Sequence, residues 1–184
     1  RTRRQRQMCI RDRYKSKKIQ TINNSNTRPM MSKVREAIFN SIQFLIDDKD
    51  VLDLYAGSGS LGIEALSRGA KFVTFVEKSK ECIEILNKNL KEFENNFIIT
   101  SSPVDTFIKS SINTYDIVFY DPPFELDKNI VEKEINNLEN LLNDSSYVII
   151  HRHKASSEIE FSKNYEIHRE KNYGQSKIII LRKI

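Results

Sequence analysis

Residues Asp121–Phe124 (DPPF) have the types needed to hold the exocyclic amine of a nucleobase during a reaction. Such an amine is a poor nucleophile because its lone pair is delocalised into the ring. The Asp121 carboxylate and the Pro122 carbonyl can accept its two N–H groups, which orients the nitrogen and stabilises the charge that develops as it attacks an electrophilic methyl group. The ring of Phe124 can stack on a base that has been turned out to reach it. DPPF alone is also a common turn sequence, so its place in the fold decides its meaning.

A second segment, Gly57–Gly62 (GSGSLG), matches the G-x-G-x-x-G pattern of nucleotide-binding loops. Glycines let the backbone turn sharply and come close to a nucleotide. Glu77 follows the second predicted strand, where a carboxylate can accept hydrogen bonds from both ribose hydroxyls of an adenosine-type cofactor. These features fit either a dinucleotide or S-adenosylmethionine.

Both segments fall within a pattern of alternating strands and helices, which is typical of a parallel sheet covered on both faces. A helix is predicted at 32–46, before the first strand. The strands that alternate with helices are predicted at 51–55, 72–76, 97–100, 115–120 and 147–151. The last two strands, 165–171 and 177–181, have no helix between them and must form an antiparallel hairpin. The sequence thus predicts a doubly wound α/β fold with a mostly parallel seven-stranded sheet and a C-terminal antiparallel hairpin.

In a doubly wound sheet, ligands bind at the carboxyl ends of the strands. The glycine segment follows the first strand and DPPF follows the fourth, so we expect them to meet in one crevice. An NAD-dependent oxidoreductase would leave DPPF unexplained and would lack a substrate domain, and a non-catalytic RNA-binding factor would not need Asp121. A methyltransferase is favoured, although adenine N6 and cytosine N4 stay open as targets because DPPF serves any exocyclic amine.

The composition suits one compact domain, with 184 residues of which 39% are apolar and 30% charged. No apolar run approaches the roughly 18 residues of a membrane helix, and the Arg-rich start lacks the apolar stretch of a secretory signal. A cytoplasmic protein without membrane contact is therefore expected. Cys9 and Cys82 have no near partner and no nearby ligand His, so neither a disulfide nor a metal site is predicted.

Positive charge is concentrated at the N-terminus. The net charge is +5, and residues 1–13 hold six Arg and one Asp, so the remainder sums to zero. Charge alone fits a solvated tail as well as it fits nucleic-acid contact. A further basic run, His151–Lys154, ends the fifth strand and is either solvated or in contact with RNA phosphates.

Three features together, Asp53–Ala70 (DLYAGSGSLGIEALSRGA), Glu77 and DPPF, resemble class I S-adenosylmethionine-dependent methyltransferases that act on amino groups of nucleic acids. Two further segments, Arg28–Asn40 (RPMMSKVREAIFN) and His168–Gln175 (HREKNYGQ), resemble the RsmD family of 16S ribosomal RNA guanine-N2 methyltransferases. The resemblance implies methyl transfer from S-adenosylmethionine to the N2 of a guanine in the assembling small ribosomal subunit. A monomer is expected.

The resemblance also implies roles for individual residues. Those expected to bind the cofactor are Asp53, near its methionine end, Gly57, Gly59 and Glu77. Those expected to hold the guanine are Asp121, Pro122 and Phe124. The chain departs from the family in having Met30 and Met31 where Thr and Asp are usual, and in lacking an acid directly after the third strand. Either Ser102 or Asp105 could make that contact with the adenine amine.

The similarity to the RsmD family extends over about residues 14–184. On this basis we divide the chain into three parts. Residues 1–13 (RTRRQRQMCIRDR) resemble a translated sequencing adapter and are predicted to be a non-native basic tail. Residues 14–46 are predicted to form an RNA-binding arm and helix, and 47–184 the methyltransferase domain. The predicted RNA contacts are Lys15, Lys17, Lys18, Arg28 and Arg35.

Overall fold

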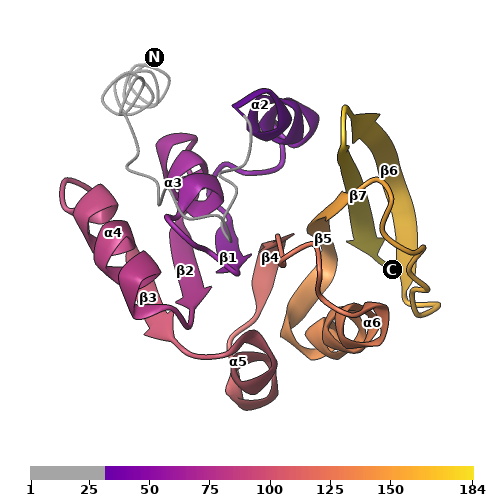
Figure 1. Cartoon of the computed structure of the whole chain (residues 1–184). Coiled ribbons are helices and arrows are strands. Elements are labelled where there is room, and N and C mark those ends of the chain that lie inside the picture. Colours follow the sequence, from indigo (N-terminus) through magenta and orange to yellow (C-terminus); the bar gives the residue numbers. More distant parts are fainter. Residues whose placement is uncertain (1–31) are drawn as a thin grey trace.

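Seven strands form a sheet in the order β3-β2-β1-β4-β5-β7-β6 in the computed structural model, which describes residues 32–184 (Figure 1). The strands are β1 (Asp50–Leu54), β2 (Phe72–Glu77), β3 (Phe97–Ser101), β4 (Tyr115–Tyr120), β5 (Leu142–His153), β6 (Tyr165–Tyr173) and β7 (Ser176–Lys183). The helices are α2 (Ser32–Ser41), α3 (Ser60–Ser67), α4 (Lys80–Leu90), α5 (Val104–Ser110), α6 (Lys128–Asn137) and the short 3-10 helix η1 (Leu138–Leu141). The predicted tail and four predicted RNA contacts, Lys15, Lys17, Lys18 and Arg28, lie outside the described residues.

The first five strands are parallel to one another, and β7 is antiparallel to both of its neighbours, β5 and β6. The order reverses at β1, because the chain moves outward to β2 and β3 and then returns to β4 on the other side of β1. This topology confirms the predicted doubly wound sheet and its C-terminal hairpin. It also puts the ends of β1, β2 and β4, which carry the predicted site, beside one another.

Helices cover both faces of the sheet, with α2, α3 and α4 on one face and α5 and α6 on the other (Figure 1). Strand residues alternate between the two cores: Val51 of β1 packs with the first group of helices, whereas Leu52 and Leu54 pack with the second. Burial on both faces explains why the central strands are continuous apolar runs. None of the helices within residues 32–184 is long and apolar enough to cross a membrane.

Two predicted elements differ from the structure by more than two residues at one end. The first helix ends at Ser41 rather than at residue 46, although Ile42 and Ile46 are buried from the turns that follow. The helical spacing of apolar residues therefore extends past Ser41 to Ile46, although the helix does not. Strand β5 is longer than predicted, because it pairs with β4 from Leu142 and with β7 as far as His153.

Candidate active site

The glycine segment forms a tight loop between β1 and α3, and packing explains its composition. Gly57 and Gly59 have φ angles of 55° and 83°, which side chains rarely adopt. A Cβ atom on Gly59 would lie 2.3 Å from Leu86 Cδ1, and one on Gly62 would lie 2.2 Å from Phe75 Cε1. The loop can therefore lie against β2 and α4 only with glycine at these positions.

Asp53 lies in β1 beneath this loop and is 1% exposed. Its Oδ2 accepts a hydrogen bond of 2.9 Å from the backbone N–H of Gly62 in the first turn of α3. Burial raises the pKa of Asp53 to about 8, an effect only partly offset by the Gly62 bond and increased by the charges of Asp121 and Glu77. Without a bound ligand, Asp53 is thus a largely neutral carboxyl group near neutral pH.

This pKa makes stability depend on pH with a definite sign. Between about pH 4 and pH 8 the native protein holds a proton on Asp53 that the unfolded chain has lost, so the free energy of unfolding falls as pH rises through this window. Asp53→Asn keeps an oxygen to accept the Gly62 bond but cannot ionise. We therefore expect the free energy of unfolding of Asp53→Asn, measured with urea, to fall less with pH than that of wild type. The stability of the variant relative to wild type should increase from pH 5 to pH 8. Parallel pH profiles for the two proteins would contradict the assignment, and Asp144→Asn, at an exposed position, is the control.

Glu77 ends β2 and holds the glycine loop by its carboxylate. Oε2 accepts a bond of 2.8 Å from the Gly57 N–H, and Oε1 accepts bonds of 2.8 Å from the N–H groups of Lys78 and Ser79. The predicted ribose acid is therefore beside the predicted loop, and it is already fixed in orientation. A rigid acceptor loses little freedom when it binds a ligand.

Asp121 follows β4 directly, and its carboxylate contacts the imidazole ring of His151 in β5. Asp121 Oδ1 lies 2.7 Å from His151 Nδ1, and the Asp121 side chain is 28% exposed. Phe124 is half-buried, with its ring in edge contact with His151 at 5.3 Å between ring centroids. Pro122, which lies between Asp121 and Phe124 in the sequence, is buried. Asp121, the predicted acceptor, and Phe124, the predicted stacking ring, thus lie in one turn after β4, and His151 of the neighbouring strand β5 contacts both.

Three carboxyl groups, Asp53, Glu77 and Asp121, come from the ends of adjacent strands and lie close enough for the other two charges to act on Asp53. An acidic site favours a cationic ligand and disfavours the pyrophosphate of a dinucleotide. S-adenosylmethionine carries a sulfonium and an ammonium group, so the site fits it better than NAD. Among residues 32–184, no group of three or more His, Cys, Asp or Glu side chains could hold a metal ion.

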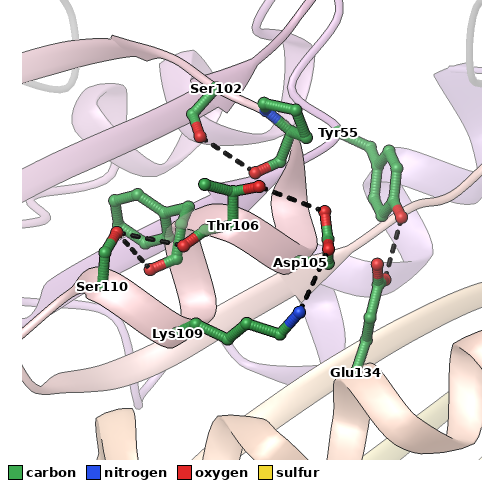
Figure 2. Close-up of polar contacts among 9 residues, drawn as sticks. Tyr55, Ser102, Asp105, Thr106, Lys109, Ser110 and Glu134 are labelled. Atoms are coloured by element: carbon green, nitrogen blue, oxygen red, sulfur yellow. Dashed lines mark hydrogen bonds and ion pairs between the residues drawn. The ribbon is translucent and has the colours of Figure 1, made fainter.

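The two candidates for the adenine contact have different surroundings (Figure 2). Ser102 is tied to β2 by a bond from its N–H to the Glu77 carbonyl, and its hydroxyl donates to the Pro103 carbonyl. Asp105 is exposed on α5, where a hydrogen bond from Lys109 holds the pKa of its carboxyl below the usual range. Both follow β3, next to the Glu77 strand, so both alternatives remain open.

Sequence reasoning missed a buried cluster beside the site. The hydroxyls of Tyr55, which precedes the glycine loop, and Tyr120, which precedes Asp121, both donate to Glu134 Oε2, at 2.8 and 2.6 Å. Figure 2 shows the Tyr55 hydroxyl pointing to Glu134 on α6. Glu134 is 5% exposed, and burial raises the pKa of its carboxyl. Glu134 follows Val131 by three residues, so it lies on the apolar face of the helix. This position is the signal from which its burial could have been predicted.

The interpretation of the basic run at the end of β5 was wrong for its first two residues. His151 and Arg152 are 5% and 4% exposed, so neither is a solvated strand end or a contact for RNA phosphates. His153 is half-buried and Lys154 is exposed, and for these two residues the interpretation stays a prediction. The reason is that distant segments contact both side chains: Ser176 and Phe124 lie against His151, and the Leu126 carbonyl accepts a hydrogen bond from Arg152. The local sequence does not indicate these contacts.

Arg35, the one predicted RNA contact within residues 32–184, is half-buried on α2. The last residue of α2 contacts the C-terminal hairpin: Arg169 Nη1 of β6 donates to Ser41 Oγ at 3.0 Å. The helix that carries the first family-like segment therefore lies against the strand that carries the second.

The sheet order, the glycine loop and the acidic strand ends define a class I methyltransferase fold. A family model described as conserved hypothetical protein 95 matches residues 9–182. The chain belongs to this family, the RsmD family to which its sequence motifs are similar.

Relatives of known name are similar over most of the chain. Ribosomal RNA small subunit methyltransferase D of Buchnera aphidicola is 37% identical over 88% of this chain and 85% of its own length. The Escherichia coli protein of the same name is 33% identical over 88% of this chain and 82% of its own. A solved structure of the Escherichia coli protein yhhF, described as a candidate methyltransferase, has a TM-score of 0.77 at 32% identity, covering 85% of this chain and 89% of that one.

Proposed function

We propose that this protein transfers a methyl group from S-adenosylmethionine to the exocyclic N2 of a guanine in 16S ribosomal RNA of the small subunit. The observation that carries the proposal is the turn after β4, where Asp121 and Phe124 lie near the carboxyl groups of β1 and β2 that flank the glycine loop. The small subunit relatives named above support the choice of RNA.

In the proposed complex, S-adenosylmethionine supplies an electrophilic methyl group on a positively charged sulfur. Glu77 accepts from the ribose hydroxyls, and the Gly57–Gly59 backbone lies against the cofactor. Asp53 gains a cationic neighbour, the ammonium of the methionine end, which favours its ionised form. Ser102 or Asp105 contacts the adenine. The charges of Glu77 and Asp121, which raise the pKa of Asp53 in the free protein, would thus be opposed by the charge of the cationic ligand.

Asp121 and the Pro122 carbonyl would hold the target amine by accepting its two N–H groups, and Phe124 would stack on the base. Attack of the nitrogen on the methyl carbon would release the sulfur as the neutral thioether S-adenosylhomocysteine, and positive charge would develop on the nitrogen, next to the Asp121 carboxylate. The methylated nitrogen would be acidic and would release its proton to water without a strong base. Asp121 therefore orients and stabilises rather than abstracts.

The experiment that tests this proposal offers the protein S-adenosylmethionine with unmethylated small subunits, naked 16S RNA or DNA, and identifies the modified nucleoside by mass spectrometry. We expect N2-methylguanosine at one position of the RNA. N6-methyladenine in any substrate would show that the same site serves the rival amine. No methyl transfer to any of the three would refute the proposal.

We further propose that residues 14–46 contact RNA phosphates, with Lys15, Lys17, Lys18 and Arg28 supplying charge beyond Arg35. Reversing Lys15, Lys17 and Lys18 to Glu should weaken RNA binding and flatten its salt dependence, while leaving the affinity for S-adenosylmethionine unchanged. Filter binding at several salt concentrations measures the RNA affinity and its salt dependence, and calorimetry measures the affinity for S-adenosylmethionine.

The control for this prediction reverses Lys88, Lys91 and Lys163, which are exposed near the amino ends of the parallel strands, away from the predicted site residues. It makes the same change in net charge and should alter RNA binding much less. Deleting residues 1–13 should cost only nonspecific RNA affinity. If that deletion abolished methylation while the three Lys reversals had no effect, both assignments would be wrong.

A further inference from the structure

We propose that His151 is a positioning residue for methyl transfer, which holds the Asp121 carboxylate in the orientation that accepts the target amine. The inference rests on the proposed function. His151 is 5% exposed at the end of β5, and its Nδ1 lies 2.7 Å from Asp121 Oδ1. His151 lies outside the sequence motifs assigned to the cofactor and the target base.

The second ring nitrogen of His151 is also engaged, since Nε2 lies 2.9 Å from Ser176 Oγ at the start of β7. A carboxylate only accepts hydrogen bonds, so Nδ1 carries a proton, and in the neutral ring Nε2 accepts from the Ser176 hydroxyl. The bonds then run in one direction, from Ser176 through His151 to Asp121. Every buried polar atom of the ring is satisfied, which fixes its orientation.

This arrangement leaves the Asp121 carboxylate with one oxygen held by the protein and the other for the target amine. An unsupported Asp side chain rotates over a broad range about its last torsion. A misplacement of about 1 Å in a positioning group can cost on the order of a hundredfold in rate. Holding Oδ1 therefore has direct consequences for the reaction.

The same imidazole ring also supports Phe124. The two rings meet edge to face, with an interplanar angle of 80°, and His153 contacts Phe124 from the next position on the same strand face, at 5.6 Å between ring centroids. The acceptor for the amine and the ring that stacks on the base thus share one support. Both ring nitrogens of His151 are bonded to protein groups, so the residue acts through Asp121 and does not itself contact the base.

The test compares two replacements of similar size in the full chain. His151→Asn can still donate an amide N–H to Asp121 from about the place of Nδ1, whereas His151→Leu cannot. We expect His151→Leu to lower kcat for methylation of small subunits about tenfold or more, with both KM values within about twofold of wild type. His151→Asn should recover most of that loss. In an Asp121→Ala background, His151→Leu should have no further effect.

Ser176→Ala is a milder variant that keeps the inference testable if the His151 replacements fail to fold. It should lower kcat by about threefold in wild type and have no effect beside His151→Leu, because Ser176 acts only through the ring. Wild-type kcat in His151→Leu or Ser176→Ala, or equal losses in the Leu and Asn variants, would overturn the inference alone. A wild-type protein that methylates none of the RNA substrates would overturn the proposed function and the inference with it.

Discussion

Replacing Asp121 by Ala should lower methyl transfer about a hundredfold or more, as expected when an acceptor that acts in the transition state is lost. S-adenosylmethionine should bind as tightly as before, because Asp121 acts on the target base after both substrates are bound. Single-turnover transfer of a labelled methyl group measures the rate, and calorimetry measures the affinity.

Two matched variants sharpen the Asp121 experiment. Asp121→Asn keeps the shape of the side chain and one acceptor oxygen, so it should lose less activity than Asp121→Ala. Asp144→Ala removes an exposed carboxyl at the far end of β5 and should leave the rate unchanged. Near-normal turnover by Asp121→Ala would refute the proposed role.

Glu77→Ala should weaken S-adenosylmethionine binding by roughly 2 to 4 kcal/mol, because it removes two charge-assisted bonds to the ribose. Isothermal calorimetry with S-adenosylmethionine and NAD measures the effect. Unchanged affinity for S-adenosylmethionine, or tighter binding of NAD, would overturn the assignment of the loop.

The bonds of Glu77 within the free protein add a second expectation. Glu77→Ala leaves the N–H groups of Gly57, Lys78 and Ser79 without their acceptor, so it should also lower the midpoint of thermal unfolding. Glu77→Gln keeps one oxygen acceptor and separates the two effects, because it should lose cofactor affinity with less loss of stability. Glu84→Ala, at an exposed position on α4, controls for the loss of charge.

The features that could be predicted from sequence have local signals. A glycine loop directly after an apolar strand, and DPPF after another, follow from residues that are adjacent in the chain. Parallel topology then brings those strand ends together, because each crossover must return to the same edge of the sheet. The predicted site residues Gly57, Glu77 and Asp121 could therefore be assigned to one edge without knowledge of any side-chain contact.

The features that could not be predicted depend on contacts between distant segments. His151 contacts Asp121, which is 30 residues away in the sequence, and Ser176, which is 25 residues away. None of the sequence motifs assigned to the cofactor or the target base links residues at these separations. Alternation along a strand places His151 on one face of β5, but only its contacts with Asp121, Ser176 and Phe124 show that this face is covered. The first helix was predicted too long for a similar reason, since Ile42 and Ile46 are buried by the tertiary fold after the helix has ended.

The position of β7 between β5 and β6 has a consequence for how the protein folds during synthesis. The ribosome makes β6 before β7, yet β6 cannot join the sheet until β7 is available to pair with it. A nascent chain that ends after β6 holds five parallel strands and a sixth without a partner, and it lacks Ser176. Contacts between segments that are distant in the sequence form late, because closing the intervening chain costs entropy before the contact stabilises it. We therefore expect the Ser176 contact that holds His151, and through it Asp121, to form late. A chain stalled before β7 would have the cofactor loop and His151 but an incomplete support for Asp121.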